Sequence, residues 1–120
     1  MMMRTGLWLL ALAVILGAFG AHGLKAMVTP DRLETWDTAV RYHVWMSLLL
    51  IALSGSSFQF SSWAYRLIVV GLLIFSGSLY LLVILDVGLL GAITPIGGVL
   101  MITGIVIAAI HCHRDLRSTN

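Results

Sequence analysis

Two histidines are the residues of this chain best suited to chemistry. His22 lies at the end of one apolar stretch and His43 at the start of the next, so we expect both at the same end of two adjacent helices. Imidazole is a good ligand for metal ions and for haem iron. The competing interpretation is a pair of histidines hydrogen-bonded to backbone or carboxylate groups. We prefer it because no third or fourth ligand has metal-site spacing, and we predict no metal and no cofactor.

Further polar side chains interrupt the apolar stretches, namely Ser47, Ser76, Ser78 and Tyr80. Ser47 follows His43 by four residues, and Tyr80 follows Ser76 by four, so each pair shares one face of a helix. These groups could line a polar pocket for a lipid headgroup or a small solute. They could instead form hydrogen bonds between helices or to their own backbone. We favour hydrogen bonding, because no charged residue lies in the middle of a stretch to mark a transport path.

The sequence contains no evident catalytic constellation. No serine, and not the single cysteine Cys112, has a histidine and an acid that the sequence can place beside it. The formal net charge is only +2, and the basic residues are scattered. We therefore predict that the protein is not an enzyme and that it does not bind nucleic acid.

These side chains must be positioned by four apolar stretches, each about long enough to cross the roughly 30 Å hydrocarbon core of a bilayer. The chain is 60% hydrophobic and 10% charged, far from the roughly 25% charged residues of a soluble domain. The sequence therefore predicts an all-α membrane protein, a compact bundle of four transmembrane helices in a single domain, residues 1–120. The expected spans are 5–24, 39–54, 64–85 and 95–111.

The predicted helix boundaries are set by a few residues. Thr29 and Pro30 form a helix start, which we expect to open a short amphipathic segment at the membrane surface or to continue into the second span. Its Trp36 suits the membrane interface. Thr94 and Pro95 form a second start, with threonine as the N-cap. Asp86 ends the third span, and we expect its carboxylate to accept N–H bonds around residues 94–96 and tighten the turn.

Small residues within the spans predict close helix packing, because they let neighbouring backbones approach in lipid. Those expected to do so are Gly17, Gly20, Gly77, Gly97 and Gly104.

The basic residues also predict an orientation. With four spans, both termini share a side with the loop 54–62, and that side collects Arg4, Arg66, Arg114 and Arg117. The other side holds Lys25, Arg32 and Arg41. Basic residues favour the cytoplasmic side, so the termini are predicted to be cytoplasmic.

Four segments, residues 16–25, 36–42, 75–82 and 93–98, together resemble a known family. It is the small four-span bacterial inner-membrane family filed as a domain of unknown function, which is similar to a eukaryotic transmembrane family. The resemblance implies a multi-pass inner-membrane protein with no established activity. One position departs from the family pattern, because Met46 stands where a histidine is expected after Tyr42. His43, about one turn earlier, could substitute for it.

Three functions follow as hypotheses. The first is a non-enzymatic structural or accessory module of the inner membrane, which meets the lipid bilayer and either a larger membrane complex or further copies of itself. The second is a small oligomeric transporter or channel for a small solute or ion. The third is a haem- or metal-binding membrane protein that uses His22 and His43.

Overall fold

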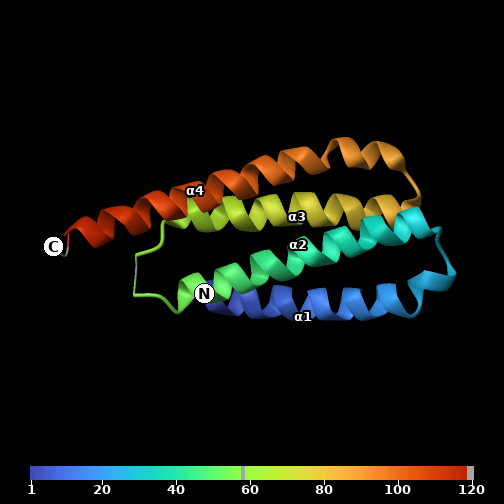
Figure 1. Cartoon of the computed structure of the whole chain (residues 1–120), viewed down its shortest axis with the longest axis horizontal. Helices are drawn as coiled ribbons and strands as arrows, with labels where there is room; N and C mark the ends of the chain where they lie inside the picture. Colours follow the sequence, from blue (N-terminus) through green and yellow to red (C-terminus); the bar gives the residue numbers. More distant parts are fainter. Residues whose placement is uncertain (58, 119–120) are drawn as a thin grey trace.

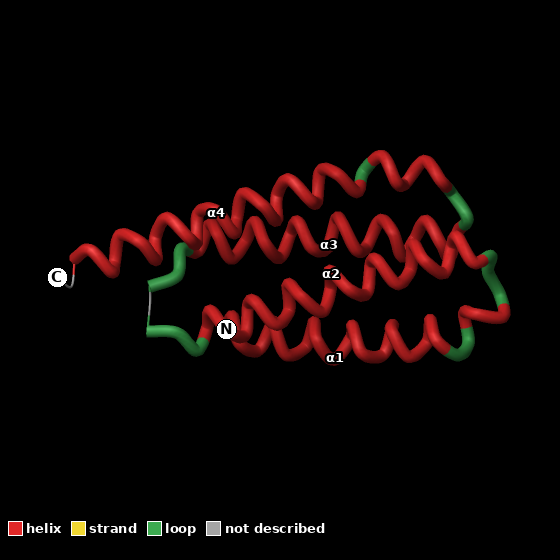
Figure 2. Tube along the Cα trace, in the orientation of Figure 1, coloured by secondary structure: helices red, strands yellow, loops and turns green. Residues whose placement is uncertain are grey.

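The computed structural model describes residues 1–57 and 59–118, and the side chains in those ranges other than 113–116. Within them the regular structure is entirely helical, as predicted, with short connections (Figures 1 and 2). The elements are α1 (Met2–Ala21), the 3₁₀ turn η1 (Leu24–Ala26), α2 (Pro30–Ser54), α3 (Ser62–Leu85), the 3₁₀ turn η2 (Gly88–Ala92) and α4 (Thr94–Ser118).

Each long helix packs antiparallel against the next one in the sequence. Helices α2 and α3 are central, and α1 and α4 lie on the two flanks, in a molecule that measures 57 × 26 × 19 Å (Figure 1). The beginning of α1 and the end of α4 lie at one end, together with the end of α2 and the beginning of α3. The turns that carry η1 and η2 lie at the other end. This arrangement puts the predicted candidate residues other than His22 on the two central helices.

Of the two expectations for the segment after Thr29, continuation into the second helix is the one observed, because the segment is the beginning of α2. The Thr29 Oγ1 accepts a hydrogen bond from the Arg32 N–H at 3.4 Å, so threonine is the N-cap and Pro30 the first helical residue, as predicted. No glycine or proline interrupts the chain between Asp31 and Ser54, so the helix runs on for 25 residues. The second helix therefore begins near residue 30 and not near residue 39.

Three helical stretches are long and apolar enough to cross a membrane: Met2–Ala26, Ser62–Leu85 and Gly88–Cys112. Helix α2 is the exception in the described part of the chain. Its charged residues crowd its first half, since Asp31, Arg32, Glu34, Asp37 and Arg41 all precede the apolar run that ends at Ser54. The predicted four helices are thus present, and three of them meet the criterion for a span by themselves.

Helices α1 and α2 lie in register along their whole length. A Cβ built on Gly6 would lie 2.8 Å from the Cγ1 of Ile51, and one on Gly17 would lie 3.2 Å from the Cγ1 of Val40. At the other end of α1, a Cβ on Gly20 would lie 2.6 Å from the Cδ1 of Trp36. Small residues on α1 therefore hold α2 close from near its beginning to near its end.

Helices α3 and α4 approach through a pair of facing glycines. A Cβ on Gly71 would lie 2.7 Å from the carbonyl oxygen of Gly97, and one on Gly97 would lie 2.6 Å from the carbonyl oxygen of Gly71. About two turns further along α4, a Cβ on Gly104 would lie 2.9 Å from the carbonyl oxygen of Ala64. Such contacts bring the two backbones together and increase their dispersion contacts.

Gly77 does not share this role, which corrects the prediction made for it. A Cβ on Gly77 would meet nothing within 4 Å. Its neighbours Ser76 and Ser78 are the residues that face other helices. Gly71, which the sequence reading passed over, makes the contact expected of Gly77.

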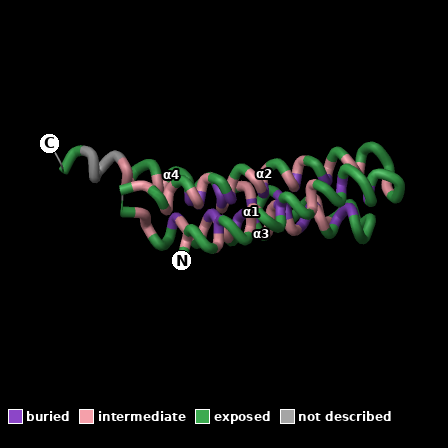
Figure 3. Tube along the Cα trace, turned by 90° about the horizontal axis from the view of Figure 1, so that it is seen from below, coloured by how far each residue is buried: buried purple, intermediate pink, exposed green. Residues whose placement is uncertain are grey.

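Buried residues follow the length of the bundle and do not gather at one end (Figure 3). The flanking helices keep large apolar side chains exposed. On α1, Trp8 and Ile15 are exposed, and on α4, Val99, Ile102 and Val106 are exposed. An exposed apolar surface of this extent is typical of contact with lipid or with another protein.

Candidate functional site: a buried polar core and a cavity at one end

The centre of the buried polar core is Trp36, whose side chain is 1% exposed. Its indole N–H donates a hydrogen bond to the Leu16 carbonyl of α1 at 2.9 Å. The ring reaches that carbonyl because Gly20 has no side chain to block it. The prediction of an interfacial Trp36 is therefore wrong. The residue lies between α1, α2 and α3, and its polar group is used inside the bundle.

Tyr80 of α3 extends the core from Trp36 towards His43. The Tyr80 and Trp36 ring centroids are 4.7 Å apart, and the Tyr80 Oη is 3.0 Å from the His43 Nδ1. His43 is 4% exposed and lies in the middle of α2. The hydrogen bond therefore joins the two central helices deep in the molecule.

The second ring nitrogen of His43 is the exception in this core. Its Nε2 is buried, and it is the one such side-chain nitrogen or oxygen without a hydrogen-bond partner among the described residues. The backbone of Leu9 in α1 interacts with the ring but completes no hydrogen bond of normal geometry. A buried polar atom without a full hydrogen bond costs free energy, so this nitrogen is the least satisfied polar group of the core.

The two serines nearest His43 both donate hydrogen bonds to backbone carbonyls. Ser76 of α3 donates to the Ala39 carbonyl of α2 at 2.9 Å, a bond between helices. Ser47 donates to the carbonyl of His43, one turn back in its own helix, at 2.6 Å. Both hydroxyls are thereby engaged within the core, one in a bond between helices and one in a bond to its own helix.

A second polar contact joins α3 to α4. The Ser78 and Thr94 hydroxyl oxygens are 2.7 Å apart, and Ser78 also lies 2.9 Å from the Phe75 carbonyl. Thr94 was expected to be an N-cap that precedes the fourth helix. Instead α4 begins at Thr94 itself, with Pro95 in its first turn, and the Thr94 side chain is directed at α3.

The structure does not bring His22 and His43 together. His22 is exposed at the end of α1, level with the start of α2. His43 follows Trp36 by seven residues, about 10 Å further along the helix. The described residues include no group of three or more His, Cys, Asp or Glu side chains that could hold a metal ion. The two histidines therefore differ in environment, since His22 is exposed at the end of α1 and His43 is buried in the middle of α2.

Asp86 makes a contact that the sequence reading did not anticipate. Its carboxylate was expected to bind N–H groups around residues 94–96, but its Oδ1 accepts a hydrogen bond from the Nε of Arg32 at 2.9 Å. The residue ends α3 in the left-handed region, with φ 52° and ψ 43°. Aspartate tolerates this conformation better than most residues. The ion pair links the start of α2 to the end of α3.

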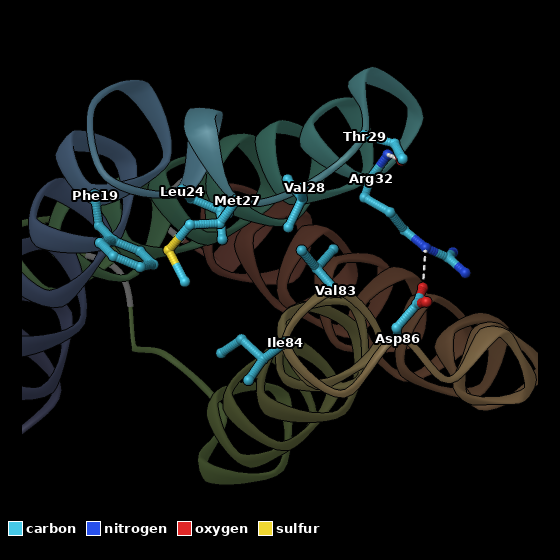
Figure 4. Close-up of a pocket in the computed structure, with 9 residues that line it drawn as sticks. All are labelled: Phe19, Leu24, Met27, Val28, Thr29, Arg32, Val83, Ile84 and Asp86. Carbon is cyan, nitrogen blue, oxygen red and sulfur yellow. Dashed lines mark hydrogen bonds and ion pairs between the residues drawn. The ribbon is translucent and has the colours of Figure 1, made fainter.

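Beside this ion pair is a cavity of about 420 Å³ (Figure 4). One wall comes from the end of α1 and from η1, and the other comes from the last turns of α3. Most of the lining is apolar, and Arg32 and Asp86 lie at one side of it. The lining residues are Phe19, Leu24, Met27, Val28, Thr29, Arg32, Val83, Ile84 and Asp86. The sequence offered one signal for the site, namely opposite charges at the facing ends of two consecutive helices.

Comparison with known proteins places most of these residues in one matched region. The family described as "Protein of unknown function (DUF423)" matches residues 16–98. That region contains Trp36, His43, Tyr80 and the Arg32–Asp86 pair, whereas most of α4 lies beyond it. The match therefore includes both the buried core and the cavity.

Individual relatives are similar over most of their length. The chain is 45% identical over 96 residues to the UPF0382 membrane protein SAB0533 of Staphylococcus aureus, which is 78% of this chain and 79% of that protein. It is 44% identical over 110 residues to the UPF0382 membrane protein YwdK of Bacillus subtilis, covering 82% and 87%. A Schizosaccharomyces pombe relative, the UPF0382 membrane protein C1782.12c, is 41% identical over 100 residues, covering 78% and 85%. No solved structure matches.

Proposed function

Because this chain belongs to the DUF423 family of proteins of unknown function, whose relatives are named membrane proteins, we propose its function on the premise that it works within a bilayer. It is a non-enzymatic module of the inner membrane that crosses the bilayer four times. It serves as a structural or accessory component and binds a larger membrane protein through its exposed apolar flanks.

The register between α1 and α2 supports the fourth crossing. Gly6 and Gly20, near opposite ends of α1, contact residues near opposite ends of α2. This register supports a crossing by α2 wherever α1 crosses the bilayer. Of the polar groups of α2, Trp36 and His43 are buried in the bundle, and the exposed acids Asp31, Glu34 and Asp37 all lie near its start. Its deepest charge is Arg41, about 16 Å from the start of the helix, where a long side chain can extend towards the interface.

The observation that carries the proposal is that the buried polar groups form hydrogen bonds between helices. Trp36, Ser76 and the pair Ser78–Thr94 each bond to a neighbouring helix. They do not converge on a shared passage, and the cavity is lined only by residues from one end of the bundle. Such an interior favours a rigid module over a permeation path. The termini are proposed to face the cytoplasm, from the distribution of basic residues.

The test is the native mass of the protein after extraction in a mild detergent. We expect a stoichiometric complex with a second membrane protein. The exposed residues Ile102 of α4 and Ile15 of α1 allow the two flanks to be tested separately, as Ile102→Trp and Ile15→Trp. The substitution on the flank that binds the partner should dissociate the complex, and the helix content should stay unchanged. Flux of a solute or ion into liposomes that contain the purified chain alone would contradict the proposal and favour the transporter.

A further inference from the structure

The facing ends of α2 and α3 create a local separation of charge beside the cavity. The start of α2 carries Arg32 and the positive pole of the helix. The end of α3 carries Asp86 and the negative pole of its helix. Within the described ranges these side chains share a single hydrogen bond, at 2.9 Å. The remaining guanidinium N–H groups and the second carboxylate oxygen are therefore open to a ligand.

Both charged side chains can be reached from outside the protein, and Asp86 is the more exposed of the two. The Asp86 side chain is 77% exposed and that of Arg32 is 32% exposed. In Figure 4 the pair lies at one side of the cavity, and Phe19, Val83 and Ile84 line its apolar part. A matching ligand must carry both a positive and a negative group at one end and an apolar body next to them.

We propose that this cavity binds one zwitterionic phospholipid whose headgroup carries a primary amine. The phosphate binds the Arg32 guanidinium, whose planar set of N–H donors matches phosphate oxygens. The ammonium group donates to the free oxygen of Asp86. One acyl chain lies against Phe19, Val83 and Ile84. This inference rests on the proposed position in the bilayer, which brings the cavity to the level of the headgroups.

Charge at this end of the molecule argues against an anionic lipid. Four acids lie at this end, Asp31, Glu34, Asp37 and Asp86, and they outnumber by one the basic residues Lys25, Arg32 and Arg41. A ligand with a net negative charge would meet this field without a compensating cation of its own. A quaternary ammonium headgroup lacks the N–H donors that Asp86 accepts. A headgroup with a phosphate and a primary amine has no net charge and supplies N–H donors to Asp86.

The cavity has a size suited to part of a lipid. Its volume of about 420 Å³ lies within the roughly 300–1,000 Å³ of ordinary ligand sites. Most of its lining is apolar, with the polar groups at one side, as is usual for a site that orients an amphiphile. One acyl chain segment fits this space, and the rest of the lipid stays in the bilayer.

The experiment measures which phospholipid stays bound. Purified protein is equilibrated with mixed micelles that contain equal amounts of phosphatidylethanolamine, phosphatidylcholine and phosphatidylglycerol with the same acyl chains, and retained lipid is counted by native mass spectrometry. We expect one bound phosphatidylethanolamine, enriched up to about fivefold over either competitor, because an exposed charge pair contributes at most a factor of this size.

Three variants locate the site, with one control. Asp86→Asn should abolish the enrichment, because it removes the charge that the primary amine binds, and asparagine tolerates the left-handed conformation of residue 86. Arg32→Gln should reduce binding of all three lipids, because each of them carries a phosphate. Ile84→Trp should fill the cavity and reduce binding of every lipid, without touching the ion pair. Arg41→Gln removes a charge from the same helix outside the cavity lining and should bind like the parent protein.

Equal retention of the three lipids, or a preference for phosphatidylglycerol, would overturn the proposal. So would unchanged enrichment in Asp86→Asn, or unchanged lipid retention in Arg32→Gln. If the charge variants fail to fold, as judged by circular dichroism, binding that survives in folded Ile84→Trp overturns it as well. None of these results would contradict the four proposed membrane crossings, which are tested separately by labelling the chain from either side of the bilayer.

Discussion

Trp36→Ala is expected to lower the free energy of unfolding by about 3 kcal/mol, at the lower end of the range for a buried tryptophan. The lower end applies because lipid tails are as apolar as a protein core, so the loss is mainly in packing and hydrogen bonding. The variant removes the bond from the indole N–H to the Leu16 carbonyl, and the ring contacts with Phe19 and Tyr80 at centroid distances of 5.8 and 4.7 Å. An SDS titration in mixed micelles, followed by circular dichroism, measures the change.

Trp45→Ala is the matched control for this experiment. Trp45 lies on the same helix, is 50% exposed and packs against Tyr42 rather than across the bundle. Its removal should change the unfolding free energy by less than about 0.5 kcal/mol. If Trp45→Ala proves as destabilising as Trp36→Ala, then Trp36 does not join the three helices in the way that the structure shows.

Gly97→Ala is expected to destabilise the pairing of α3 and α4 by about 1–3 kcal/mol, the usual cost of forcing extra volume into a packed contact. The added methyl would lie 2.6 Å from the Gly71 carbonyl oxygen, which belongs to backbone and cannot move aside as a side chain would. Gly71→Ala should behave in the same way, because its methyl would lie 2.7 Å from the Gly97 carbonyl oxygen. The same titration in micelles measures both.

The adjacent Gly98 supplies the control. A Cβ there would lie 3.7 Å from the nearest atom of the Phe75 ring, an ordinary contact, so Gly98→Ala should be neutral or slightly stabilising. The double variant Gly71→Ala/Gly97→Ala adds a sharper criterion. Once one methyl has separated the helices, the second should cost less than it does alone. Full additivity would show that the two glycines do not face each other.

Much of the fold follows from local sequence signals. Four apolar stretches separated by Thr29–Pro30 and Thr94–Pro95 are sufficient to predict four helices, because these pairs start helices for reasons local to the chain. Small residues predicted close packing, and at Gly20 and Gly97 the neighbouring helix does lie within contact distance of where a side chain would start. Family membership was also evident from four short segments, and the comparisons confirm it.

The candidate site depends on tertiary register, which local signals do not contain. Placing the second helix at residue 39 put His43 at a helix start beside His22, whereas the continuous α2 puts it in the middle of the bundle. The contact between Arg32 and Asp86 joins residues 54 apart in sequence, so it requires the alignment of α2 with α3. Trp36 was assigned to the interface from residue type, but Gly20 on another helix provides the space that buries it.

The central claim is that α2, although more polar than the other long helices, crosses the bilayer beside α1. Two connections test it directly, because Lys25 precedes α2 and Ser57 follows it, and both residues are exposed. Cys112 is the single cysteine, so Cys112→Ser gives a background for one introduced cysteine at a time. Gly88→Cys, at the same end of the bundle as Lys25→Cys, is the control.

The measurement is labelling with a membrane-impermeant maleimide, before and after permeabilisation of cells that express each variant. Lys25→Cys and Gly88→Cys should react in intact cells, and Ser57→Cys should react only after permeabilisation. The reverse pattern would keep four crossings and invert the orientation. Reaction of Lys25→Cys and Ser57→Cys from the same side would show that α2 does not cross, and would contradict the four-span architecture on which the proposed function rests.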